Sequence, residues 1–72
     1  MKMSSPHSSV VSSIGHDEKS GELHVVWKNT GKTSIYSNVS PSTAKLVMNS
    51  WSVHSALIEH VKTKNYPHRY KE

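Results

Sequence analysis

Apolar residues in the first half of the chain fall into three short stretches with turn residues between them. The first stretch, residues 10–14, is rich in β-branched side chains, and in residues 23–27 Leu, Val and Trp recur at every second position. A period of two is typical of a half-buried strand. Turn residues occupy positions 19–21 and 29–32, and residues 33–36 form the third stretch. This pattern predicts an antiparallel meander of three strands.

The second half of the chain carries helical signals. Ser40 precedes a Pro, which favours a helix start because the Ser hydroxyl can cap free amides and Pro is tolerated at the first helical position. The apolar stripe changes phase near residues 49–52. This change predicts two short helices over residues 41–50 and 53–64, with a single bent helix as the alternative. Pro67 prevents further extension.

These elements predict an α+β fold in which a three-stranded antiparallel β-meander is followed by two short α-helices. The single domain is expected to span residues 9–66. Residues 1–8 are Ser-rich without apolar periodicity, so we expect a disordered tail there, and residues 67–72 are expected to form a basic tail. A domain of 72 residues buries only roughly 60% of the surface of its unfolded chain. This marginal burial favours docking on a partner or a homo-oligomer.

Composition narrows the protein class. The chain has no Cys, which excludes a disulfide framework and removes the commonest structural zinc ligands. No apolar run reaches the ~20 residues of a membrane-spanning helix, and the first residues lack the apolar core of a signal peptide. We therefore expect a soluble, cytoplasmic protein with no membrane segment.

The charge of the chain is positive and uneven. Nine Lys and Arg residues against five Asp and Glu residues give a net charge of +4. After residue 60, basic residues are interleaved with Tyr and His, and only the last residue is acidic. Such a segment suits a phosphate backbone and stacked bases. The alternative is that Lys62 and Lys64 complement the negative end of the second helix and the rest is a solvated terminus.

Patterns that would indicate an enzyme are missing from the sequence. Asp17, Glu18 and Glu22 cluster at one hairpin, and no second acidic group pairs with them for acid and base chemistry. There is no Gly-x-Ser-x-Gly or phosphate-loop motif. His54 and His60 lie about 240° apart around a helix, so they do not share a metal ion. The sequence predicts a non-enzymatic protein with no cofactor and no metal site.

The order of these motifs resembles the KTSC domain, a family named for the C-terminus of some lysyl-tRNA synthetases. The residues that carry the resemblance are 12–17, 21–25, Gly31, and 36–39 leading to Pro41. The resemblance covers about residues 9–70 and implies a β-β-β-α-α fold. The central Tyr-x-Tyr of the family appears here as Ser-Ile-Tyr at positions 34–36, so one of its two aromatic rings is replaced.

Members of this family stand alone in bacteria and phages or are appended to a synthetase. The resemblance implies binding of nucleic acid, RNA rather than DNA, and an exposed Tyr36 on the sheet would stack a base. The alternative is that Tyr36 and Trp27 are core residues that pack the sheet against the helices. The candidate nucleic-acid residues are Lys28, Lys32, Tyr36, Lys62, Lys64, Arg69 and Tyr70.

A protein-interaction module is the second function class. The short helices carry more apolar side chains than one helix face can bury, and an apolar surface of this kind meets a partner protein or a second copy. Leu46 and Ile58 are the candidate residues. Such a module would be, for example, a phage-encoded adaptor or inhibitor that docks on a host enzyme acting on nucleic acid.

Overall fold

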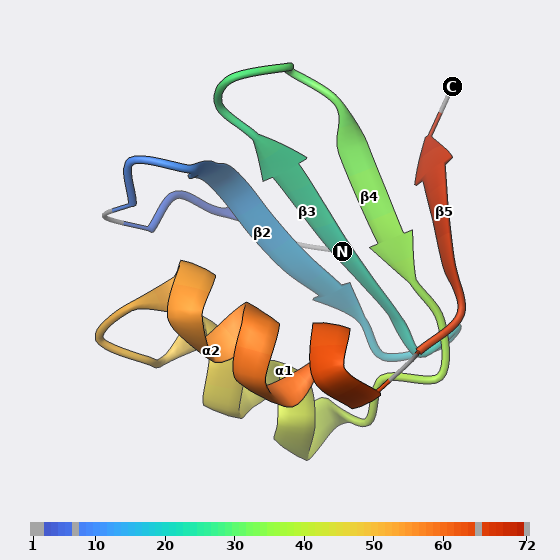
Figure 1. Ribbon diagram of the computed structural model, residues 1–72. Helices are drawn as coiled ribbons and strands as arrows, with labels where there is room; N and C mark the ends of the chain where they lie inside the picture. Colours follow the sequence, from blue (N-terminus) through green and yellow to red (C-terminus); the bar gives the residue numbers. More distant parts are fainter. Residues whose placement is uncertain (1–2, 7, 65, 72) are drawn as a thin grey trace.

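A computed structural model of the chain shows an α+β domain built from two layers. One layer is a single antiparallel sheet, and the other consists of helices that cover one face of that sheet (Figure 1). The structure describes residues 3–6, 8–64 and 66–71. The predicted α+β class is confirmed.

Within the described residues the sheet has five strands, which follow one another in sequence order. They are β1 (Met3–Ser4), β2 (Val11–Asp17), β3 (Glu22–Trp27), β4 (Thr33–Tyr36) and β5 (His68–Lys71). The central strands β2, β3 and β4 form the predicted meander. The prediction of three strands is wrong in its strand count, because β1 pairs with β2 and β5 pairs with β4 at the two edges.

Both additional strands come from segments that were expected to be tails. β1 has two residues, and the side chains of β5 are polar or aromatic without an apolar alternation. Their strand conformation depends on backbone pairing with a neighbour that is distant in sequence, so the local pattern does not reveal it. Positions 1–2, 7 and 72 of the expected tails lie outside the described residues.

The two turns of the meander lie where the sequence predicts them. Gly21 is the last residue of the β2–β3 turn and has a φ of 73°, and Gly31 lies in the β3–β4 connection and has a φ of 70°. Glycine adopts positive φ without the steric penalty of a Cβ atom. These two positions therefore fix the hairpin turns and, with them, the register of the central strands.

The two predicted α-helices are confirmed as α1 (Pro41–Met48) and α2 (Val53–His60). Ser40 caps α1 by accepting from the backbone N of Thr43, and Ser52 caps α2 in the same way. The chain then tightens into a 3₁₀ turn, η1 (Lys62–Lys64), so the predicted second helix ends earlier than expected. The break between the helices lies at the predicted change of phase.

The core lies between the helices and the central strands. Strand pairing places Ser34 beside Val25 and Tyr36 beside Leu23, so these side chains share the face that the helices cover. The buried side chains that form the core are Val11, Ile14, Leu23, Val25, Tyr36, Val39, Ala44, Val47, Val53, Ala56, Leu57 and Val61. Tyr36 is only 5% exposed. The alternative role as a core residue therefore describes Tyr36, and its ring is not an open stacking surface.

An ion pair crosses the opposite face of the sheet. Arg69 Nη2 on β5 donates to Glu22 Oε2 on β3 at 2.6 Å, and His24 Nε2 lies 3.4 Å from Glu22 Oε1. The hydrogen bond from Arg69 lowers the pKa of Glu22, and His24 lowers it further against an opposing desolvation effect. The side chain of Arg69 thus links β5 to β3 across the intervening strand.

This ion pair predicts a loss of stability in acid. Because the pKa of Glu22 is depressed in the folded state, the unfolded chain binds more protons there, and stability falls as the pH drops below about 4.3. Glu22→Gln should lower the thermal midpoint at pH 7 and reduce its fall between pH 7 and pH 3. Glu59→Gln, at an exposed site on α2, is the control. If the thermal midpoint of Glu22→Gln fell as much as that of the wild type between pH 7 and pH 3, the Glu22 ion pair would not be the cause of the acid sensitivity.

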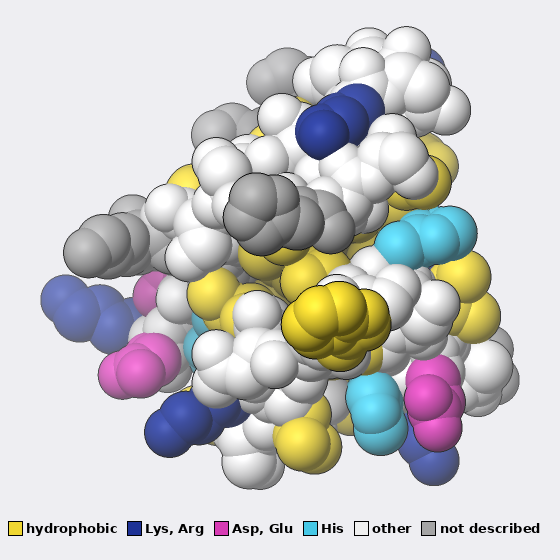
Figure 2. Space-filling model, turned by 90° about the vertical axis from the view of Figure 1, so that its left-hand side faces the viewer, with side chains coloured by type: hydrophobic (Ala, Val, Ile, Leu, Met, Phe, Trp, Pro, Cys, Tyr) yellow, Lys and Arg dark blue, Asp and Glu magenta, His cyan; other side chains and the backbone are white. Residues whose placement is uncertain are grey.

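Some apolar side chains of the helical layer remain at the surface. Leu46 on α1 is 60% exposed, Ile58 on α2 is 40% exposed, and Trp51 in the connecting loop is fully exposed. Figure 2 views the side of the molecule where this loop lies and shows hydrophobic side chains standing among polar ones. The structure places both sequence-predicted interaction residues, Leu46 and Ile58, at the surface.

Candidate functional site

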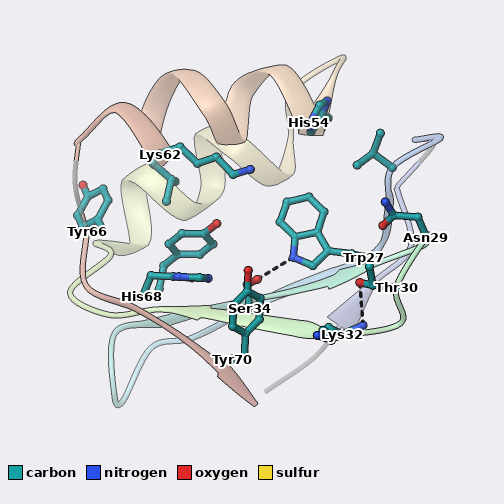
Figure 3. A pocket seen from close by; sticks show the side chains of 13 residues that line it. Trp27, Asn29, Thr30, Lys32, Ser34, His54, Lys62, Tyr66, His68 and Tyr70 are labelled. Carbon is teal, nitrogen blue, oxygen red and sulfur yellow. Dashed lines mark hydrogen bonds between the residues drawn. The ribbon is translucent and has the colours of Figure 1, made fainter. Parts of the chain in front are cut away.

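A hollow of about 650 Å³ lies between the sheet and the α2–η1 segment (Figure 3). We call it the aromatic hollow, because four Tyr and Trp side chains line it. The described residues that line it are Val10, Trp27, Asn29, Thr30, Lys32, Ser34, Tyr36, His54, Val61, Lys62, Tyr66, His68 and Tyr70. Its walls come from β3, the β3–β4 turn, β4 and β5 on one side and from α2 and η1 on the other.

The indole of Trp27 is held in a fixed orientation on the sheet side. Its Nε1–H donates to Ser34 Oγ at 2.7 Å, and Ser34 is itself buried. The His54 ring on α2 meets the indole edge-on, with 6.5 Å between ring centroids and an interplanar angle of 90°. Trp27 is partly buried and packs against the core, so its ring forms a rigid part of the wall.

The hydrogen bond between Trp27 and Ser34 predicts a measurable loss of stability when it is removed. Ser34→Ala removes this partly buried hydrogen bond, and a typical intramolecular hydrogen bond contributes about 0.5–1.5 kcal/mol to the free energy of unfolding. Urea unfolding followed by circular dichroism measures this change. In a Trp27→Phe background, where the donor is already absent, Ser34→Ala should cost much less. An equal cost in both backgrounds would show that the hydrogen bond does not contribute.

A row of three rings runs from β4 onto β5. The His68 ring lies 4.8 Å from the Tyr36 ring and 4.8 Å from the Tyr70 ring, measured between centroids. Strand pairing explains this row, because Tyr36 is opposite His68 and Tyr70 is opposite Ser34. Burial raises the pKa of Tyr36, and the neighbouring Tyr70 adds to the increase. Tyr36 is therefore neutral and buried at the inner end of the row, whereas Tyr70 is 59% exposed at the outer end of the row.

Two lysines bring positive charge to the aromatic hollow. Lys62 Nζ on η1 lies 4.9 Å from the centroid of the Trp27 ring, and Lys32 Nζ lies 5.9 Å from that of Tyr70. Both distances are within the range of a cation–π interaction. None of the described residues that line the hollow is acidic. The site combines exposed ring surface with uncompensated positive charge, which suits a ligand that carries both aromatic groups and negative charge.

The structure brings together part of the sequence-predicted nucleic-acid set. Lys32, Tyr36, Lys62 and Tyr70 line the aromatic hollow, with Tyr36 in the buried role described above. Lys28 and Lys64 are exposed but do not line it. Arg69 pairs with Glu22 on the far face of the sheet, because neighbours on a strand point to opposite faces.

Several residues of the site were not among the sequence-predicted candidates. Trp27, Ser34, His54, Tyr66 and His68 all line the hollow. The alternation of residues 23–27 places Trp27 on the helix-facing side of the sheet, and this signal suggests only a core role. His68 and Tyr70 share a face once residues 68–71 are recognised as a strand. The described residues contain no group of three His, Cys, Asp or Glu side chains arranged to hold a metal ion.

No helix in the described part of the chain has both the length and the apolar character needed to cross a membrane.

Comparisons with known proteins place the chain in a family. A family model described as the KTSC domain matches residues 7–66. The fold is also similar to the crystal structure of a KTSC domain protein from Yersinia pestis, with a TM-score of 0.85 and 21% sequence identity. That similarity covers 99% of this chain and 97% of the Yersinia chain. The search of curated proteins found no match.

Proposed function

The chain belongs to the KTSC domain family, and we propose that it is a small, non-enzymatic binding domain for single-stranded nucleic acid, RNA rather than DNA. The aromatic hollow is the proposed binding site. Phosphates would lie near Lys32 and Lys62, and unpaired bases would stack on the exposed aromatic surface.

One observation carries the proposal: lysine and aromatic side chains share a hollow whose described lining contains no carboxylate. Phosphate groups pair with Lys, and every base has a face that stacks on an aromatic ring. Asn29 and Thr30 line the same hollow and offer polar groups for a ribose 2′-hydroxyl, the group that distinguishes RNA from DNA.

The size of the hollow favours an unpaired strand over a duplex. Its volume of about 650 Å³ lies within the range of small-ligand pockets, so its size suits a nucleotide rather than a double helix. The bases of a duplex are stacked on one another and are not free to enter such a site. We therefore expect single strands, loops or ends to be the ligands.

Fluorescence anisotropy tests the proposal with labelled single-stranded RNA, single-stranded DNA and duplex RNA, each titrated with the purified protein at two salt concentrations. We expect micromolar or tighter binding that prefers single-stranded RNA and weakens as salt rises. Absence of binding to all three ligands at low salt would contradict the proposal.

A protein-interaction module is the second candidate function, and the exposed Leu46, Trp51 and Ile58 side chains favour it. The simplest partner is a second copy of the chain. Sedimentation velocity over a range of protein concentrations tests this partner. Self-association that is lost in Trp51→Ser and persists at high salt would support an interaction module. Persistence at high salt is expected because ions do not screen an apolar interface. A monomer at all concentrations would exclude a second copy as the partner.

A further inference from the structure

Each of the two lysines of the aromatic hollow lies over an aromatic ring on which a base could stack. Lys62 Nζ lies 4.9 Å from the Trp27 ring centroid, and Lys32 Nζ lies 5.9 Å from that of Tyr70. Figure 3 shows these residues around one hollow. A cation over a ring is held by the same electron-rich face on which a base stacks. The ammonium groups therefore occupy positions that a bound base would take.

The Trp27 ring is fixed more firmly than the lysine above it. Trp27 is held by its hydrogen bond to Ser34 and by packing against the core. Lys62 is exposed on η1, and a lysine reaches its position through a flexible four-carbon stem. Lys32 is likewise exposed, at the end of the β3–β4 turn. An incoming base would consequently displace the ammonium and leave the ring in place.

We propose, on the basis of the nucleic-acid function above, that the rings of Trp27 and Tyr70 are stacking positions for two unpaired bases, and we call these positions seats. In the free protein, Lys62 caps the Trp27 seat and Lys32 caps the Tyr70 seat. When a base stacks on its ring, the lysine leaves the ring face and pairs with a phosphate of the same strand. The ligand is thus a short single-stranded segment of at least two nucleotides. The lysines act both as caps in the free state and as phosphate contacts in the bound state.

The sheet brings the two seats close together. Trp27 on β3 donates to Ser34 on β4, and Ser34 pairs directly with Tyr70 on β5. Neighbouring strands lie about 4.8 Å apart, so the backbones of β3 and β5 are about 10 Å apart. Tyr36 and His68 support the Tyr70 end of the hollow through their ring contacts. Two adjacent bases of one strand can therefore reach both rings.

Tryptophan fluorescence tests the Trp27 seat with adenosine and adenosine 5′-monophosphate, which differ only in the phosphate. The chain has two Trp residues, so Trp51→Phe leaves Trp27 as the single reporter. In this background both probes should quench the emission in a saturable manner, and the monophosphate should bind more tightly. Adding Lys62→Gln should tighten adenosine binding roughly threefold, because the cap is gone, and should remove most of the advantage of the monophosphate.

The opposite changes in the two probes distinguish capping from other roles of Lys62. A lysine that only attracts phosphate would leave adenosine binding unchanged, and a lysine with a structural role would weaken both probes. Either result would overturn the capping proposal. Lys45→Gln, an exposed lysine on α1, carries the same charge change and should leave the adenosine affinity unaltered.

The Tyr70 seat is tested with the dinucleotide ApA and with adenosine 5′-monophosphate. Tyr70→Ala should weaken ApA several-fold and leave the monophosphate nearly unchanged, because only the dinucleotide reaches the second seat. An equal effect on both probes would overturn the two-seat arrangement. RNA anisotropy on the same variants distinguishes failure of the seat arrangement from failure of the RNA-binding function. RNA binding without quenching of Trp27 would overturn the seats alone, and absence of RNA binding would overturn the function as well.

Discussion

Replacing Lys32 and Lys62 together with Ala is expected to weaken binding of single-stranded RNA by at least about tenfold at low salt, because a hydrogen bond to a charged group contributes about 1.5–3 kcal/mol. The salt dependence should fall as well. Each phosphate neutralised on a single strand adds about 0.7 to the slope of log affinity against log salt, so the double variant should lose about 1.4. Anisotropy titrations at several salt concentrations measure both changes.

A second pair of lysines provides the matched control. Lys19 and Lys45 are exposed on the β2–β3 turn and on α1, and neither lines the aromatic hollow. Their double Ala variant removes the same net charge, so a general electrostatic attraction would be weakened equally in both variants. We expect the control to retain most of the affinity and slope of the wild type. Equal losses in the two variants would show that the hollow is not the binding site.

Leu57→Ala is expected to lower the free energy of unfolding by about 2–5 kcal/mol, the range for a buried Leu that leaves a cavity. Leu57 lies on α2 with no exposed surface and contacts the core that joins the helices to the sheet. A domain of 72 residues has a total stability of roughly 4–11 kcal/mol at typical values per residue. This single change should therefore unfold a large fraction of the protein in mild urea.

The neighbouring residue is the control for this effect. Ile58 follows Leu57 on α2 and is 40% exposed. Its change to Ala removes the same number of side-chain carbons as Leu57→Ala. Ile58→Ala should cost much less than Leu57→Ala, because part of the side chain already contacts water. Urea unfolding of both variants by circular dichroism gives the comparison. Similar losses in the two variants would contradict the placement of α2 on the sheet.

Much of the fold was predictable because its signals are local. The two Gly-containing turns and the period of two in residues 23–27 identify the central strands, and the Ser40 cap and the change of phase identify the two helices. The edge strands were not predictable in this way. β1 and β5 carry no apolar alternation, and their pairing partners on β2 and β4 are distant in sequence.

The candidate site was predictable only in part, and β5 explains the difference. Charge and aromatic content identified Lys32, Lys62 and Tyr70, which line the hollow. The sequence also predicts Arg69 as a member of this set, because it is basic and adjacent to Tyr70. Once residues 68–71 are a strand, Arg69 points to the far face and pairs with Glu22 instead.

The role of Trp27 in the aromatic hollow was not predictable from the pattern of its strand. Its place in an apolar alternation predicts burial, and the ring does pack on the core. Its part in the aromatic hollow depends on Lys62 and His54, which come from the helical layer. No pattern within the strand reports these contacts, so the role of Trp27 is visible only in three dimensions.

A ¹H–¹⁵N correlation spectrum recorded during titration with single-stranded RNA tests whether the aromatic hollow is the binding site. The indole N–H of Trp27 lies at the aromatic hollow, whereas Trp51 is fully exposed in the α1–α2 loop, so the two indole signals report two separate surfaces. We expect shifts in the signals of the Trp27 indole and of the backbone amides of Lys32 and Tyr70, with the Trp51 signal unchanged. Shifts at Trp51 and Leu46 with an unchanged Trp27 signal would contradict this expectation.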